Sequence, residues 1–238
     1  MKYKFDKGFI ASTLFFFCSA LTFGQTPSQI ADLVKAVKFD DAKEVKAYLN
    51  QGFSPNLVDA NGNPLLVLAI KDKSYGVTEV LLSAKDMDVD LSNKQGETPL
   101  MFAAINGDLP LVKTLVLKHK AQLDHISWTP LHYACAKGNY EVAQFLLSKG
   151  AMVDSLSLGG TTPLMMAVQS GNEYTVKLLL NYGANLQIRN QVGLSAIDIA
   201  DIYNQPVISE GLRSRWAKLY KQPYPGPINP SGAKSSKD

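Results

Sequence analysis

A segment of about 33 residues recurs along the chain, and no other feature of the sequence limits the possible folds as strongly. Three clear copies begin with GETPLMFAAINGD at Gly96, SWTPLHYACAKGN at Ser127 and GTTPLMMAVQSGN at Gly160. A weaker copy begins at Gly62 and a truncated one at Gly193. A unit this short cannot bury its own apolar face, so the copies must stack on one another in a solenoid.

Each copy carries signals for two helices. A hydroxyl side chain stands where the first helix begins in four copies, at Thr98, Thr129, Thr162 and Ser195. Such a hydroxyl accepts a hydrogen bond from the free amides of the first turn. Glycines that tolerate positive φ follow in three copies, at Gly107, Gly138 and Gly171. The runs LVKTLV, EVAQFLL and TVKLLL then space apolar residues for a second, antiparallel helix.

The segment TPLHYACAKGNYEVAQFLLSKGA, from Thr129 to Ala151, closely resembles the ankyrin repeat, whose pattern reads TPLHxA, a glycine and then VxxLLxxGA. TPLMMAVQSGNEYTVKLLLNYGA, from Thr162 to Ala184, is nearly as similar. The resemblance covers about Gln29 to Ile208. It implies an all-α solenoid of antiparallel helix pairs joined by β-hairpin-like loops, which project at right angles and leave a concave face.

These patterns divide the chain into eight parts. We expect a signal peptide at 1–24, an N-terminal capping repeat at 25–60, four ankyrin repeats at 61–94, 95–126, 127–158 and 159–191, a C-terminal capping repeat at 192–220, and a tail at 221–238. The connection from Lys120 to Trp128 is about three residues shorter than the one from Gly150 to Thr162, so its loop should project less. The tail is rich in proline and small polar residues, which predicts a disordered basic extension.

The amino terminus has the pattern of an export signal. A net-positive start, MKYKFDKGF, precedes an apolar run of 14 residues and the small residues Thr22 and Gly24. This order is typical of a secretory signal peptide, and the run is shorter than the roughly 20 apolar residues that span a bilayer. We expect cleavage between Gly24 and Gln25, export to the bacterial periplasm and no stable membrane anchor afterwards; secretion is the alternative.

Composition and charge exclude several classes of protein. Hydrophobic residues make up 46% of the chain and charged residues 19%, which is the balance of an ordinary globular protein. The net charge is +3, and residues 211–238 hold six basic side chains against Asp238 alone. Charges spread this thinly do not form the dense basic patch that binds nucleic acid. We therefore expect no nucleic-acid partner.

A metal site near the middle of the chain is the main chemical alternative. His119, His125, His132 and Cys135 lie within 17 residues, and His132 and Cys135 have a spacing that metal ligands use. However, His132 is the histidine of TPLH, which hydrogen-bonds within the turn in the ankyrin family. The equivalent positions hold two residues that we expect not to serve that role, Met101 and Met165. Cys135 occupies a small-residue position of the repeat, which indicates a core residue.

No catalytic pattern stands out. The sequence contains no glycine-rich phosphate loop after a strand and no nucleophile elbow with a Ser-His-Asp order. The alternating carboxylates Asp86, Asp88 and Asp90 lack the glycine and the closing glutamate of a calcium loop. We therefore expect neither enzymatic activity nor a cofactor or metal ion.

Recognition by surface remains, because solenoids present extended concave faces to partners. In ankyrin proteins the loop tips and the exposed residues of the first helices commonly make the contacts. On the loops we expect partner-binding residues at Lys94, Gln95, Glu97, Trp128, Leu158, Thr161, Gln191 and Val192. On the first helices we expect them at Ile70, Lys71, Ile105, Asn106, Ala136, Lys137, Gln169 and Ser170.

Trp128 has two interpretations. An accessible tryptophan beside a groove is typical of a binding hot spot, whereas a tryptophan before TP can also pack on the neighbouring loop. At the level of the whole protein, the sequence favours a monomeric, non-catalytic module that binds a protein partner in the periplasm. Two alternatives stay open: an inhibitor or immunity-type protein that blocks a specific enzyme, and a secreted effector directed at a host.

Overall fold

The computed structural model describes residues 26–228, and this part of the chain contains twelve α-helices and no strand. The helices form six pairs: α1 (Pro27–Lys38) with α2 (Ala42–Asn50), α3 (Leu65–Lys71) with α4 (Tyr75–Leu82), α5 (Pro99–Ile105) with α6 (Leu109–Lys113), α7 (Pro130–Ala136) with α8 (Tyr140–Ser148), α9 (Pro163–Ser170) with α10 (Glu173–Asn181), and α11 (Ala196–Ile202) with α12 (Pro206–Tyr220). A π-helical turn, η1 (Thr114–Lys118), continues α6. The predicted all-α solenoid of helix pairs is confirmed.

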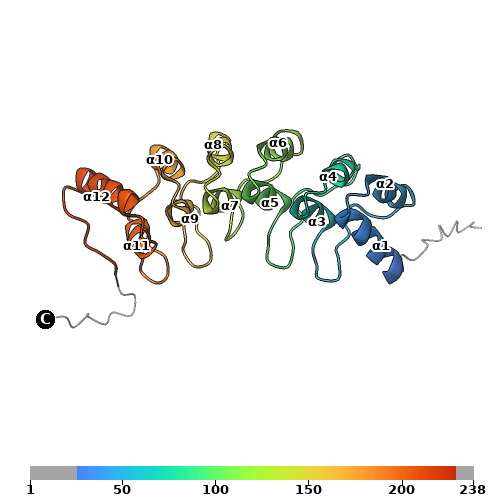
Figure 1. The fold of residues 1–238 in the computed structure, drawn as a ribbon, viewed down its shortest axis with the longest axis horizontal. Helices are drawn as coiled ribbons and strands as arrows, with labels where there is room; N and C mark the ends of the chain where they lie inside the picture. The colour runs from blue at the N-terminus through green and yellow to red at the C-terminus, as the bar shows by residue number, and fades with distance from the viewer. Residues whose placement is uncertain (1–25, 229–238) are drawn as a thin grey trace, which may run out of the picture.

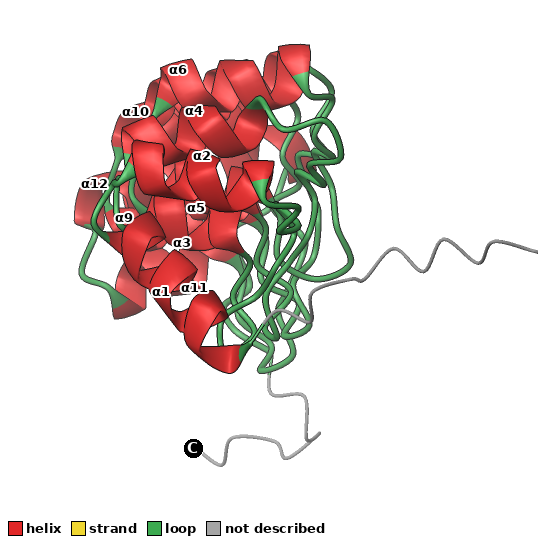
Figure 2. Cartoon of the chain, turned by 90° about the vertical axis from the view of Figure 1, so that its right-hand side faces the viewer, coloured by secondary structure: helices red, strands yellow, loops and turns green. Residues whose placement is uncertain are grey.

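The pairs stack side by side into an arch (Figure 1). The first helices of consecutive pairs pack on one another, as α5 does on α7 and α7 on α9. The connecting loops project from one side of the stack, away from the helices (Figure 2). The loop that precedes α7 projects less than its neighbours, as its shorter sequence predicts (Figure 1). The first helices and the loops together form the concave face.

Side-chain caps fix where the first helices begin. Thr98, Thr129 and Thr162 each accept a hydrogen bond from the backbone amide three residues later, as the repeated TP motif predicts. Helix α3 begins without a side-chain cap, because its copy of the repeat lacks the threonine. Gly138 ends α7 with φ of 65°, and a Cβ there would lie 2.7 Å from the side chain of Asn172. This turn therefore requires glycine.

One continuous core runs along the stack between the two rows of helices. Cys135 is fully buried in it, as is Ala104 at the equivalent position one repeat earlier. Both residues are small, which lets neighbouring first helices approach closely. The interpretation of Cys135 as a core residue agrees with this position.

Carboxylates tie successive loops together on the outer side. Each accepts a backbone N–H from the next loop: Asp90 from Gln122 at 2.9 Å, Asp124 from Met152 at 3.1 Å, and Asp154 from Asn185 at 3.0 Å. Asp90, the last carboxylate of the sequence DMDVD, therefore helps to stack neighbouring loops.

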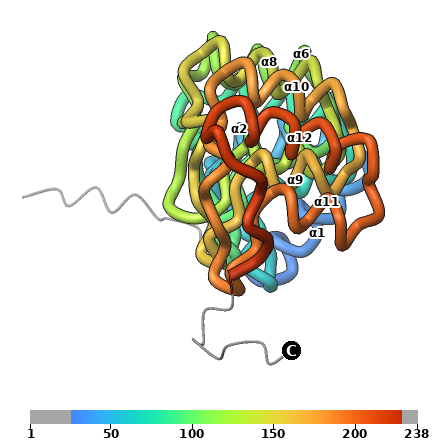
Figure 3. The backbone as a smooth tube through the Cα atoms, turned by 90° about the vertical axis from the view of Figure 1, so that its left-hand side faces the viewer, coloured from blue at the N-terminus to red at the C-terminus, as the bar shows by residue number. Residues whose placement is uncertain are grey.

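The tail differs from its prediction. The sequence predicts a disordered extension from residue 221, whereas the structure places residues 221–228 across the C-terminal end of the stack (Figure 3). The phenol of Tyr224 packs on Trp216 there, with the ring centroids 5.0 Å apart. Composition alone could not show this contact, because it depends on residues of α12 and of the last loop.

The predicted signal peptide, its junction at Gly24 and Gln25, and the end of the tail at 229–238 lie outside the described residues. Between residues 26 and 228, none of the helices has the length and apolar character needed to cross a membrane.

Candidate functional site: the concave face

A small pocket opens on the concave face between α5, α7 and α9. It has a volume of about 190 Å³ and is lined by six residues: Ile105, Trp128, His132, Tyr133, Ala136 and Met166. Three of these six were predicted from the sequence as partner-binding residues: Ile105, Trp128 and Ala136. Apart from the edges of His132 and Tyr133, the lining consists of apolar side chains. A pocket of this kind takes an apolar side chain and excludes water from around it.

Trp128 forms one wall of this pocket and combines both of its interpretations. Its ring packs edge-on against His132 at 5.3 Å and against Tyr133 at 6.4 Å, centroid to centroid. The side chain nevertheless remains 36% exposed. Trp128 is therefore held in a fixed orientation by α7 while one face of it stays open to a partner, which is the usual state of a binding hot spot.

His132 supports the pocket from beneath. It is fully buried, its Nδ1 accepts from the backbone N–H of Thr129 at 3.2 Å, and its Nε2 donates to the carbonyl of Thr161 at 2.9 Å. Burial lowers the pKa of His132 to about 4, against the opposing effect of its hydrogen bonds. The neutral imidazole thus joins the start of α7 to the loop of the next repeat.

The two methionines at the equivalent position make one of the two hydrogen bonds that His132 makes. The Sδ of Met101 accepts from the N–H of Thr98 at 3.4 Å, and the Sδ of Met165 from the N–H of Thr162 at 3.5 Å. The expectation that methionine cannot replace the histidine is thus wrong for the bond within the turn. Thioether sulfur is a weak acceptor and no donor, so methionine cannot make the bond to the next loop.

Tyr133 closes the side of the pocket nearest to the preceding loop. Its hydroxyl donates to Oε1 of Glu97 at 2.6 Å, and Oε2 of Glu97 accepts from Asn93 at 2.8 Å. Burial, and then the bond to Glu97, raise the pKa of the Tyr133 phenol. Glu97, predicted as a contact residue, therefore fixes the pocket wall with both of its carboxylate oxygens.

A row of exposed apolar side chains continues from the pocket along the loop tips. Ile126 is 98% exposed, Leu158 75% and Val192 63%, and each stands on a different loop. Adjacent tips are tied together, since Ser127 Oγ accepts from the N–H of Leu158 at 3.2 Å and Gln191 donates to the Leu158 carbonyl at 2.6 Å. The row is thus presented by loops that brace one another. Ile126 was not predicted, because nothing in its local sequence marks a loop tip.

The remaining predicted residues differ in exposure. Seven of them are exposed: Lys71, Lys94, Gln95, Asn106, Lys137, Gln169 and Gln191. Two are partly covered, Thr161 and Ser170. Ile70 is buried, with 3% of its surface exposed, because α5 packs over it. The expectation that Ile70 faces the groove is therefore wrong.

The sequence profile described as ankyrin repeats in three copies matches residues 33–127 and 105–190. The chain belongs to the ankyrin repeat family. It is 28% identical over 174 residues to the human transient receptor potential cation channel subfamily A member 1, and 30% identical over 152 residues to the mouse ankyrin repeat and SAM domain-containing protein 6. It is also 30% identical over 165 residues to a putative ankyrin repeat-containing protein of Treponema pallidum.

These matches cover 69%, 64% and 69% of this chain but only 15%, 14% and 45% of the respective relatives. The chain therefore spans less than half the length of each of these relatives. Ankyrin repeats generally mediate protein–protein interaction, and the pocket of this chain lies between the first helices of three consecutive repeats.

The metal hypothesis finds no support in the geometry. Across residues 26–228, no three His, Cys, Asp or Glu side chains lie close enough together to hold a metal ion. His132 is held by Thr129 and Thr161, and burial raises the pKa of the Cys135 thiol, which disfavours the thiolate that would bind a metal. The spacing of His132 and Cys135 thus reflects the repeat.

A larger hollow of about 740 Å³ lies elsewhere, between α2, α4 and the loops that follow them. Its lining mixes charged and apolar side chains, among them Lys46, Glu79 and Phe53, and contains none of the predicted contact residues. We favour the smaller pocket as the functional site, because an apolar lining beside an exposed tryptophan concentrates binding energy better than a wide hollow with a mixed lining does.

The burial of Cys135 predicts that its thiol reacts slowly in the folded protein. In a protein that begins at Gln25, Cys135 is the sole cysteine. We expect a thiol reagent to react at least about 100-fold more slowly with the native protein than with the protein in concentrated guanidinium chloride, because a buried thiol with a raised pKa is neither accessible nor ionised. Equal rates in the two conditions would show that Cys135 is accessible and would contradict its place in the core.

Proposed function

We propose that this protein is a non-catalytic module of the bacterial periplasm that binds one protein partner through its concave face. The pocket that Trp128 borders carries the proposal. It combines a fixed but partly exposed tryptophan with the apolar side chains of Ile105 and Met166, and a row of apolar loop tips extends it. Binding energy in protein interfaces concentrates in such central, apolar and aromatic sites. The signal-like amino terminus supports a periplasmic location.

The partner that fits this surface inserts one large apolar side chain into the pocket and lays further apolar contacts on the loop tips. Lys94, on the loop that precedes α5, and Lys137, at the end of α7, are exposed and form no ion pair within residues 26–228. Both ammonium groups are therefore available to pair with carboxylates of a partner at the rim of the interface. Rim charges of this kind affect the rate of association more than the affinity.

Affinity capture from the native envelope fraction tests the proposal. We expect the tagged protein to retain a partner that is lost when Trp128→Ala and Ile105→Ala are combined, with the affinity lowered at least about 30-fold. The matched control is Tyr174→Ala, because Tyr174 is 73% exposed but lies on α10, in the other row of helices. Each variant must first show a melting temperature close to that of the parent protein.

The outcome separates the alternatives. A partner retained by the pocket variant and lost from the control would contradict binding through the concave face. A captured enzyme whose activity falls when the pure protein is added would favour an inhibitor or immunity-type role over a scaffold. Detection of the protein inside host cells would favour an effector.

A further inference from the structure

Residues 221–228 lie against the last repeat in a specific way (Figure 3). After α12 the chain reverses at Lys221, which has φ of 57°, and runs back along the end of the stack. We call this segment the C-terminal strap. Its backbone reaches the last loop at two points: the carbonyl of Gly226 accepts from Arg189 at 2.8 Å, and the N–H of Ile228 donates to the carbonyl of Gly193 at 3.3 Å.

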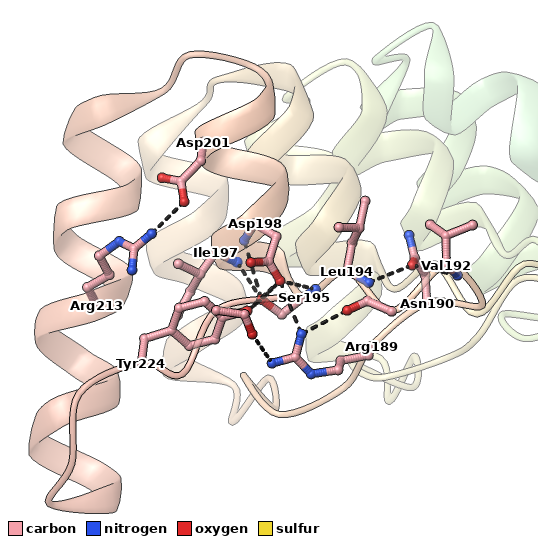
Figure 4. Close-up of polar contacts among 12 residues, drawn as sticks. Arg189, Asn190, Val192, Leu194, Ser195, Ile197, Asp198, Asp201, Arg213 and Tyr224 are labelled. Carbon is pink, nitrogen blue, oxygen red and sulfur yellow. Dashed lines mark hydrogen bonds and ion pairs between the residues drawn. The ribbon is translucent and has the colours of Figure 1, made fainter. Parts of the chain in front are cut away.

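Tyr224 is the centre of the strap (Figure 4). Its hydroxyl lies 2.7 Å from Oγ of Ser195 and donates to the carboxylate of Asp198. Its ring lies between two guanidinium groups, that of Arg189 at 5.6 Å and that of Arg213 at 5.3 Å. Tyr224 thus contacts the first turn of α11, the last loop and α12 together.

Within the stack, the loop of the following repeat occupies the same place. The cap of α7 is Thr129, whose hydroxyl lies 3.4 Å from Oγ of Ser155, and His132 donates to the carbonyl of Thr161. Ser155 and Thr161 both belong to the loop that leads into α9.

Ser195 and Asp198 are the equivalents of Thr129 and His132 in the last repeat, and no further repeat follows α11 and α12 within the described residues. The groups that a following loop would contact are here contacted by Tyr224. The hydrogen bond from Ile228 to the carbonyl of Gly193 also has a counterpart within the stack. Gly160 is the equivalent of Gly193 in the preceding repeat, and the carbonyl of the residue before it, Gly159, accepts from the N–H of Gln191 on the next loop.

We propose that the C-terminal strap takes the place of the loop of a missing next repeat and closes the open end of the solenoid. Terminal repeats of a solenoid need such a cover, because they have a neighbour on one side only. The presence of an aspartate at 198, where the repeat of α7 has His132, is consistent with contact to the C-terminal strap in place of a following loop. At the start of α7 the histidine donates to a backbone carbonyl of the next loop, whereas at the start of α11 the aspartate accepts from the phenol of Tyr224.

The test uses hydrogen exchange of the full-length protein. In Tyr224→Ala we expect the amides of Ile197 and Asp198 to exchange at least about tenfold faster, while Val45 in α2 keeps its rate, because a lost cover opens the last repeat first. The melting temperature should fall by about 3 °C or more. Tyr224→Phe, which keeps the ring and loses the hydroxyl, should have an intermediate effect. Pro227→Ala, an exposed position of the same strap, should behave like the parent protein.

Two results would overturn the proposal. One is unchanged exchange at Ile197 and Asp198 in Tyr224→Ala, which would mean that the strap rests on the last repeat without protecting it. The other is an equal increase at Val45 and at Ile197, because the strap would then affect the whole protein and not its end.

Discussion

Acidification from pH 7 to pH 4 is expected to lower the free energy of unfolding by about 3 kcal/mol through His132 alone. In the unfolded chain this histidine takes up a proton with the ordinary pKa of 6.5, whereas in the folded protein burial lowers the pKa to about 4. Between these two values the unfolded state binds more protons, so stability falls as the pH falls. The contribution is fully present above pH 6.5 and is lost by about pH 4.

The hydrogen bonds explain why the folded state resists protonation. Nδ1 of His132 accepts from the N–H of Thr129, so a proton added there would face another donor. The side chain is fully buried, and burial disfavours the charged form of an imidazole. Protonation therefore both breaks the bond within the turn and places a cation in the core.

The chain itself suggests the matched control. His132→Met installs the residue found at the equivalent positions of two neighbouring repeats, where its sulfur accepts the same type of bond. Urea unfolding at pH 7, 5.5 and 4 should show a steep loss of stability in the parent protein and a shallower one in the variant. The variant should also be less stable at pH 7 by about 1 kcal/mol, because it lacks the bond to Thr161. Parallel pH profiles would contradict the assignment to His132.

The architecture could be predicted from the sequence because repetition makes each signal visible several times. One threonine before a proline is weak evidence for a helix start, but the same pair at Thr98, Thr129 and Thr162 fixes the phase of the repeat. The phase then assigns Cys135 to the core and Ile105, Trp128 and Ala136 to one face. The structure brings these last three residues together in one pocket.

The degree of burial of individual side chains could not be predicted from the repeat pattern. Ile70 and Ile105 hold equivalent positions, yet the first is buried and the second is only partly covered, a difference in depth that the repeat pattern does not encode. Met166 was missed for the opposite reason. It stands in an apolar run that favours a core position, but it is only partly buried and lines the pocket.

The C-terminal strap shows the limit of local composition. A segment with several prolines and no apolar periodicity predicts disorder, because it cannot form a core of its own. Tyr224 instead completes a site whose other members lie more than 20 residues earlier, at Ser195 and Asp198. The repeat pattern places Asp198 at the position of the TPLH histidine, but this exchange alone does not identify Tyr224 as its partner.

Replacement of Asp198 by alanine is expected to lower the free energy of unfolding by about 3 kcal/mol. The carboxylate is 4% exposed, and Oδ2 accepts from the N–H of Ser195 at 2.8 Å, from its hydroxyl at 2.9 Å and from Arg189 at 3.2 Å, in addition to Tyr224 (Figure 4). Alanine would leave the N–H of Ser195 without an acceptor and the guanidinium of Arg189 without its counter-charge. Buried groups left in this state cost far more than the loss of a surface pair.

Asp201→Ala is the matched control, because Asp201 stands three residues later on the same helix and pairs with Arg213, but both side chains are 45% exposed. Its loss should cost less than about 1 kcal/mol in the same urea unfolding measurement. A comparable loss in both variants would mean that the charge of Asp198 stabilises the protein no more than a surface charge does. If Asp198→Ala alone is costly, the buried carboxylate couples the start of α11, the last loop and the strap, and the end of the solenoid owes its stability to that single group.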